Sequence, residues 1–251
     1  MFDLSGKLAL VTGCRRGIGL AMAEALALAG ADIVGTSLSL PDGASEVRSR
    51  VEAAGRSFVA YRADLAEPSA AAGLAHELER DGHSIDILVS NAGTIMRAPA
   101  VDHTDDMWAT VIQTNLTSAF VLAREVGRTM VERRHGKIVF TASMLSFQGG
   151  INVASYTAAK SGLVGLVRAL SNEWAPHGVN VNAIAPGYIA TDNTQALRDD
   201  ANRYASILER IPAGRWGEPS DLAGATVFLA SAASDYVDGI VLPVDGGWLG
   251  Q

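Results

Sequence analysis

The chain has 251 residues, of which 48% are hydrophobic and 19% are charged, and its formal net charge at pH 7 is −7. A chain of this length and composition can bury one sizeable core, so we expect a single domain spanning residues 1–251. The acidic balance argues against broad affinity for nucleic acids or anionic membranes, because both need clustered cations.

Membrane, disulfide and metal chemistry are not indicated. No apolar stretch continues over the ~20 residues that a membrane span needs, and residues 1–6 are too few and too acidic for a signal peptide. The single Cys14 excludes an internal disulfide and suits a reducing compartment, and the five histidines lack paired ligand spacing. We therefore expect a cytoplasmic protein without a bound metal.

Short apolar runs alternate with helical patterns along the chain, which is typical of an α/β protein with a parallel sheet. The runs predict strands at residues 7–11, 32–36, 58–61, 85–89, 137–141, 179–184 and 240–244. We expect a Rossmann-type doubly wound sheet of about seven parallel strands with helices on both faces. Functional groups should gather where strands four to six end, at the carboxyl edge.

A glycine cluster follows the first predicted strand. Gly13, Gly17 and Gly19 have the spacing G-x-x-x-G-x-G and precede a helical pattern over residues 20–29. Glycines allow the backbone to approach a pyrophosphate, whose charge is favoured at the amino end of a helix. The cluster therefore predicts a dinucleotide site, and a glycine-rich turn without a nucleotide is the alternative.

The end of the second predicted strand bears on the choice of nucleotide. Sheets that bind NAD usually place a carboxylate there for the ribose 2′-hydroxyl, but this chain has Thr36 and Ser37. Arg16, directly before Gly17, could pair with a 2′-phosphate. The local charge favours NADP.

Tyr156 and Lys160 form the most informative pair in the chain. Residues four apart share a helix face, so the ammonium of Lys160 can lie beside the phenol of Tyr156. A nearby cation lowers the pKa of a tyrosine and makes it a usable general acid or base. Such a pair on its own is common by chance and would usually be a solvated helix face.

With Ser143, which lies 13 residues before Tyr156, these motifs resemble the short-chain dehydrogenase/reductase family over essentially the whole chain. Residues 90–93, Ser-Asn-Ala-Gly, resemble a strand end of that family in which Ser90 replaces an asparagine. The resemblance implies that Ser143 orients the substrate, Tyr156 exchanges its proton, Lys160 holds the nicotinamide ribose and Asn115 anchors a proton relay.

The same resemblance and the local charge together predict the nucleotide contacts. Asp64 and Leu65 resemble the pair at the adenine ring, and residues 186–191 resemble the loop under the nicotinamide. We expect the NAD(P) contacts to be Gly13, Arg16, Gly17, Ile18, Gly19, Ser37, Asp64, Leu65, Asn91, Ala92, Gly93, Tyr156, Lys160, Pro186, Gly187, Ile189 and Thr191.

A narrower resemblance concerns the second half of the chain. Residues 142–150, 172–175, 191–195, 210–217 and 244–249 are similar to the 2-deoxy-D-gluconate 3-dehydrogenase subgroup, also described as 2-dehydro-3-deoxy-D-gluconate 5-dehydrogenase. The resemblance implies a deoxy sugar acid as substrate and a homotetramer packed through the helices that carry Asn115 and Tyr156. The subgroup is associated with NAD, so the nucleotide remains NAD(P), with the local charge favouring NADP.

Substrate contacts are expected from Ser143, Tyr156, Arg97 and Gln148. A guanidinium can hold a carboxylate by two parallel hydrogen bonds, which favours Arg97 as the anchor of the acid. Gln148 could bind sugar hydroxyls. A solvated arginine and a loop-bonding glutamine are the alternatives. Residues 192–208, within a segment near 188–215, are polar and helical in pattern, and they predict a substrate lid or an ordered surface helix.

Two other functions use the same motifs. A 3-oxoacyl carrier-protein reductase would share the catalytic residues, although docking of an acidic carrier favours a basic surface. A non-enzymatic dinucleotide sensor would share the fold, but it would not need Ser143, Tyr156 and Lys160 together.

Overall fold

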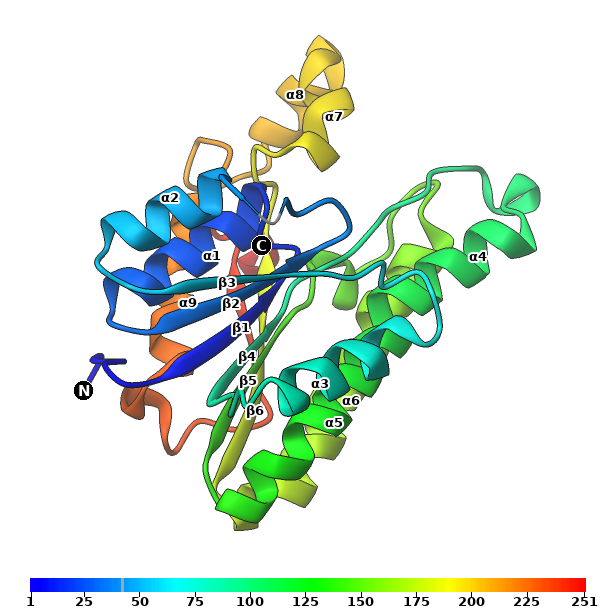
Figure 1. Ribbon diagram of the computed structural model, residues 1–251. Helices are drawn as coiled ribbons and strands as arrows, with labels where there is room; N and C mark the ends of the chain where they lie inside the picture. Colours follow the sequence, from blue (N-terminus) through cyan, green and yellow to red (C-terminus); the bar gives the residue numbers. More distant parts are fainter. Residues whose placement is uncertain (42) are drawn as a thin grey trace.

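The computed structural model describes residues 1–41 and 43–251 and contains one seven-stranded sheet in the order β3-β2-β1-β4-β5-β6-β7 (Figure 1). Every neighbouring pair of strands is parallel. The strands are β1 Leu8–Thr12, β2 Asp32–Ser37, β3 Phe58–Arg62, β4 Ile87–Ser90, β5 Gly136–Thr141, β6 Val179–Pro186 and β7 Val241–Val244. All seven predicted strands are confirmed to within three residues at each end.

Helices cover both faces of the sheet, as Figure 1 shows: α1, α2 and α9 lie on one face, and α3, α5 and α6 lie on the other. Each layer buries its own apolar core against the sheet. The strands are therefore apolar on both faces, which explains why they appear in the sequence as continuous runs rather than alternating patterns. The bounds are α1 Gly17–Leu28, α2 Glu46–Ala53, α3 Ala70–Arg80, α4 Asp105–Ile112, α5 Ser118–Arg133, α6 Ala154–Trp174 and α9 Ala223–Ala230.

Two short helices, α7 (Gln195–Asp199) and α8 (Ala201–Leu208), stand apart from both layers at the top of the view in Figure 1. The predicted helical character of residues 192–208 is thus confirmed. An aromatic cluster fastens the pair to the body of the protein: Tyr204 stacks on Trp216, which makes an edge contact with Tyr188. We refer to residues 192–208 as the lid segment.

Residues 1–41 and 43–251 contain no helix that is long and apolar enough to cross a bilayer. The same residues contain no group of three His, Cys, Asp or Glu side chains placed to hold a metal ion.

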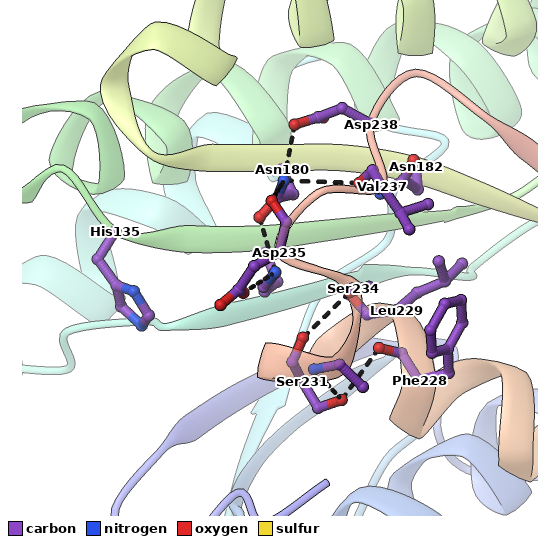
Figure 2. Close-up of polar contacts among 12 residues, drawn as sticks. His135, Asn180, Asn182, Phe228, Leu229, Ser231, Ser234, Asp235, Val237 and Asp238 are labelled. Carbon is purple, nitrogen blue, oxygen red and sulfur yellow. Dashed lines mark hydrogen bonds and ion pairs between the residues drawn. The ribbon is translucent and has the colours of Figure 1, made fainter. Parts of the chain in front are cut away.

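A polar network closes the amino-terminal edge of the sheet (Figure 2). From β6, the amide of Asn180 donates to Asp238 at 2.7 Å, and the backbone N–H of Val181 donates to the same carboxylate at 2.8 Å. The ammonium of Lys137, only 5% exposed, donates to Asn180 and to Asp235 at 2.7 Å each. The network holds residues 235–238 against β5 and β6 and so places the chain that enters β7.

The two members of the Lys137–Asp235 ion pair should differ in their effect on stability. The Asp235 side chain is 68% exposed, whereas that of Lys137 is 6% exposed. Asp235→Ala leaves a buried ammonium with one partner fewer, so it should lower the free energy of unfolding by about 1–3 kcal/mol. Lys137→Met leaves a carboxylate that water can reach and should cost less. Urea denaturation of both variants measures the order, and a larger loss for Lys137→Met would contradict this explanation.

Candidate active site

A cleft of about 790 Å³ opens at the carboxyl edge of the sheet, between the segments that follow β1, β2, β3, β4, β5 and β6. All seventeen residues expected to contact the nucleotide line this cleft, and so does Ser143. Asn115, Arg97 and Gln148 do not line it. Further residues that sequence reasoning overlooked also line the cleft, among them Arg15, Leu38, Ser39 and Thr94.

The backbone of the glycine turn has a conformation that only residues without a side chain readily adopt. Gly13 and Gly17 have φ angles of +67° and +57°, which other residues rarely adopt. A Cβ atom on Gly19 would lie 2.2 Å from the carbonyl oxygen of Gly13. Within the described chain no side chain caps α1, and its first turn has no acidic residue, so the N–H groups and positive dipole end face the cleft.

Asn91 and Thr12 hold the glycine turn against the end of β4. The hydroxyl of Thr12 accepts the backbone N–H groups of Asn91 and Ala92 at 2.9 Å each. The amide of Asn91 donates to the carbonyl of Thr12 at 3.0 Å. Residues 91–93 are therefore locked beside the turn.

Next to it, burial raises the pKa of the Cys14 thiol to about 11, which removes it from redox chemistry at neutral pH.

Hydroxyl and guanidinium groups occupy the end of β2. Ser37 donates to the carbonyl of Thr36 at 2.7 Å and accepts the backbone N–H of Arg15 at 3.3 Å. The Arg15 guanidinium donates to Ser39. Arg16 instead forms an ion pair with Asp192 of the lid segment, with Nη1 2.5 Å from Oδ2. The position of Arg15 directly beside Arg16 in the sequence could have identified it as a second cation at this site.

Asn115 lies behind the cleft in a π-helical turn, Gln113–Thr117, and is 1% exposed. Its amide oxygen accepts the N–H of Thr94 and its amide nitrogen donates to the carbonyl of Thr94, both at 2.8 Å. A Cβ atom on Gly93 would lie 3.2 Å from the same amide oxygen. Asn115 thus fixes the chain that leaves β4 in the position where it borders the cleft.

Lys160 joins helix α6 to strand β5. Its ammonium is 4% exposed and donates to the carbonyl of Thr141 at 2.6 Å. Its carbonyl accepts the hydroxyl of Ser146 at 2.7 Å. Ser143, in the same connection, caps the turn Met144–Ser146 by accepting the N–H of Leu145. These bonds hold Ser143 and Lys160 beside the cleft, which Tyr156 also lines.

The electrostatics of Tyr156 differ from the prediction. We expected Lys160 to lower the pKa of Tyr156, but burial raises it, and a hydrogen bond with Ser143 and the charge of Arg97 offset only part of that rise. Burial dominates because a phenolate loses its hydration there. The Nζ atom of Lys160 lies 5.7 Å from the ring centroid and is directed at Thr141. Burial also lowers the pKa of Lys160, to about 8.

The two expected substrate contacts have different surroundings. Arg97 is exposed and donates to the carbonyl of Asn193 in the lid segment at 3.0 Å. Its charge acts on Tyr156, so it lies near that phenol although it does not line the cleft. The side-chain oxygen of Gln148 accepts the indole N–H of Trp248 at 3.3 Å, as the loop-bonding alternative predicts.

This arrangement places the chain in a known class. A family model described as enoyl-(acyl carrier protein) reductase matches residues 13–249. The chain belongs to this family, within the short-chain dehydrogenases/reductases, and is an NAD(P)-dependent oxidoreductase.

Individual relatives narrow the comparison. The chain is 58% identical over 250 residues to 2-dehydro-3-deoxy-D-gluconate 5-dehydrogenase of Pseudoalteromonas atlantica, covering 100% of this chain and 98% of the relative. It is 51% identical over 251 residues to the Escherichia coli protein of the same name, with coverage of 100% and 98%. A structure of gluconate 5-dehydrogenase from Burkholderia cenocepacia with NADP and tartrate matches with a TM-score of 0.94 at 40% identity, covering 100% of this chain and 98% of that one. The predicted family and sugar-acid subgroup are confirmed.

The hydroxyl at the end of β2 yields a prediction on nucleotide choice. Ser37→Asp should shift preference toward NAD by about 1–3 kcal/mol, because a carboxylate accepts hydrogen bonds from a ribose hydroxyl and repels a 2′-phosphate. Titration of the variant with NAD and NADP measures the two dissociation constants, with Ser37→Ala as the uncharged control. Unchanged constants for both nucleotides would show that Ser37 does not face the adenosine ribose.

Proposed function

We propose that this chain transfers a hydride between NADP and a hydroxyl or keto group of a deoxy sugar acid of the 2-dehydro-3-deoxy-D-gluconate type. The observation that carries the proposal is that Ser143, Tyr156 and Lys160 line the same cleft as the uncapped amino terminus of α1. The names of the relatives supply the substrate class.

The residues of the cleft fit a dinucleotide. A side chain at Gly19 would collide with the carbonyl of Gly13, and one at Gly13 would crowd Ala92, so the glycines permit the close turn that brings backbone near a pyrophosphate. The end of β2 offers the hydroxyls of Ser37 and Ser39 and the guanidinium of Arg15, with no carboxylate in β2 beyond Asp32 at its start. This polarity suits a 2′-phosphate, and we infer a preference for NADP.

When bound, NADP would supply or accept the hydride. Tyr156 is protonated at neutral pH because burial raises its pKa, so it donates its proton to the reacting oxygen when a ketone is reduced. In the reverse direction it takes the proton of the alcohol. Ser143 donates a hydrogen bond to the same oxygen and keeps it next to the phenol. Lys160 remains largely protonated at pH 7 and favours negative charge at Tyr156 as the proton leaves.

In our proposal Asn115 supports the proton path indirectly, because its two hydrogen bonds to Thr94 fix the backbone that passes Lys160. Gly93 is the residue of this backbone beside Lys160: a Cβ atom on it would lie 3.8 Å from the ammonium. We place a water chain between Lys160 and solvent at this point. We also propose that the protein acts in the cytoplasm as a homotetramer packed through the helices that carry Asn115 and Tyr156.

Arg97 is the proposed anchor of the substrate carboxylate, and the lid segment is proposed to close over it. The guanidinium already bonds a carbonyl oxygen of the lid segment, so it can exchange that acceptor for a carboxylate. Gln148 has its acceptor engaged by Trp248, which leaves its amide N–H groups for sugar hydroxyls.

The catalytic role of Tyr156 is tested with a substrate panel. Tyr156→Phe should keep nucleotide binding and lower turnover by roughly 10²–10⁴. Deoxy keto sugar acids, neutral sugar alcohols and acetoacetyl thioesters, each with NADH and NADPH, distinguish the substrate classes. Fastest turnover of the thioester would identify a carrier-protein reductase. Nucleotide binding without turnover of any substrate would identify a sensor.

The role of Arg97 is tested by comparing charged and neutral substrates. Arg97→Leu should raise KM for the sugar acid about ten- to hundredfold, the equivalent of losing a charge-assisted pair of roughly 1.5–3 kcal/mol, with a smaller effect on kcat. A neutral ketone of similar size should be unaffected, and Arg203→Leu in the lid segment is the matched control. Equal losses with both substrates, at unchanged Tm, would remove Arg97 from this role.

A further inference from the structure

The loop between β4 and α4, which carries Arg97, is fastened to the start of α6 at two points. The backbone N–H of Ala98 donates to the carbonyl of Asn152 at 3.1 Å. Five residues further along, the Nε2 atom of His103 lies 2.8 Å from the hydroxyl oxygen of Ser155. Ser155 directly precedes Tyr156 in the first turn of α6. Both fastenings therefore join the loop of the carboxylate anchor to the helix of the proton donor.

The contact between His103 and Ser155 is enclosed. Ser155 is 0% exposed, and a buried hydroxyl without a partner is destabilising. The other ring nitrogen of His103, Nδ1, is buried and has no hydrogen-bond partner among the described residues. The orientation of the ring consequently depends on the single bond to Ser155.

Among the described residues no side chain caps the start of α6, so the bond from Ser155 to His103 is important for its position. The residue before α6, Val153, provides no side-chain cap, and Asn152 has a left-handed φ of +62°. His103 immediately precedes Thr104, which caps α4 through the N–H of Met107. The bond thus joins the residue before the cap of α4 to the first turn of α6, and these two helices pack against each other.

Resting on the function proposed above, we propose that His103 is a positioning residue: through Ser155 it sets the separation between the carboxylate anchor Arg97 and the phenol of Tyr156, and so favours acids whose carboxylate and reacting carbon match that separation. The charge of Arg97 already acts on Tyr156 in this structure, so the two groups are close enough for a shift of the loop to matter. A misplacement of the order of 1 Å can lower turnover up to about a hundredfold.

The kinetic test compares His103→Ala with His103→Gln, whose amide nitrogen can occupy the place of Nε2. His103→Ala should lower kcat/KM for the sugar acid about tenfold, while the neutral ketone and the dissociation constant for NADP change less than about twofold. His103→Gln should restore most of the loss. Equal losses with acid and ketone, or no rescue by glutamine, would overturn the positioning role.

Two further variants keep the test independent of folding. Ser155→Ala should reproduce the effect of His103→Ala, and the double variant, which leaves no orphaned hydroxyl, should show no additional loss. Additive losses would mean that the two residues act separately and would refute the pairing. Tm of each variant identifies a general loss of stability.

A titration without substrate separates this inference from the proposed function. The ionisation of Tyr156, followed by NMR of ring-labelled tyrosine with Tyr156→Phe as the assignment control, reports the charge of Arg97. His103→Ala and Arg97→Leu should each raise the pKa of Tyr156, and together no further. An unchanged pKa in His103→Ala, alongside a raised one in Arg97→Leu, would overturn the inference even if the parent enzyme reduces the sugar acid.

Discussion

The active site depends on the bond from the buried ammonium of Lys160 to the carbonyl of Thr141, 2.6 Å long. It fastens the first half of α6 to the carboxyl end of β5, and the Ser146–Lys160 bond fastens the intervening turn to the same helix. Burial lowers the pKa of Lys160 to about 8, below its value in an unfolded chain. The unfolded chain therefore binds more protons between pH 8 and about 10.5, so this burial costs stability at neutral pH and the cost disappears as the pH rises through that window.

Stability and function occupy opposite edges of the sheet. At the amino-terminal edge, the buried Lys137 has two partners, and Asn180 and Asp238 complete the network with backbone groups. At the carboxyl edge, α1 begins without a side-chain cap in the described chain, and its N–H groups face the cleft. Parallel strands gather all their carboxyl ends at one edge, which is why residues from the segments after six of the strands meet in this cleft.

The sequence predicted the sheet well because strands buried on both faces leave continuous apolar runs, and it predicted the glycine turn because backbone geometry there excludes other residues. It did not predict contacts that only the fold creates. Arg16 pairs with Asp192, 176 residues away, and Gln148 pairs with Trp248, 100 residues away, and no local pattern encodes either partner. The prediction of a lowered pKa for Tyr156 was wrong for a related reason. Helical spacing identifies a neighbouring cation but gives no measure of burial, and burial has the larger effect on the pKa of Tyr156. No sequence motif indicated the role we propose for His103, because that role follows from its bond to Ser155, which is fully buried.

The central claim is that Lys160 and Thr141 hold Tyr156 where hydride transfer to a sugar acid can occur. It is tested most directly by incubating the enzyme with NADPH deuterated at both C4 positions and the 5-keto form of 2-dehydro-3-deoxy-D-gluconate, and locating the deuterium by NMR and mass spectrometry. The structure predicts that the label appears on the carbon that becomes the alcohol, and that Lys160→Met, which removes the tie while keeping the length of the side chain, transfers almost none. Oxidation of NADPH without label in the sugar acid, or equal transfer by folded Lys160→Met, would contradict this account.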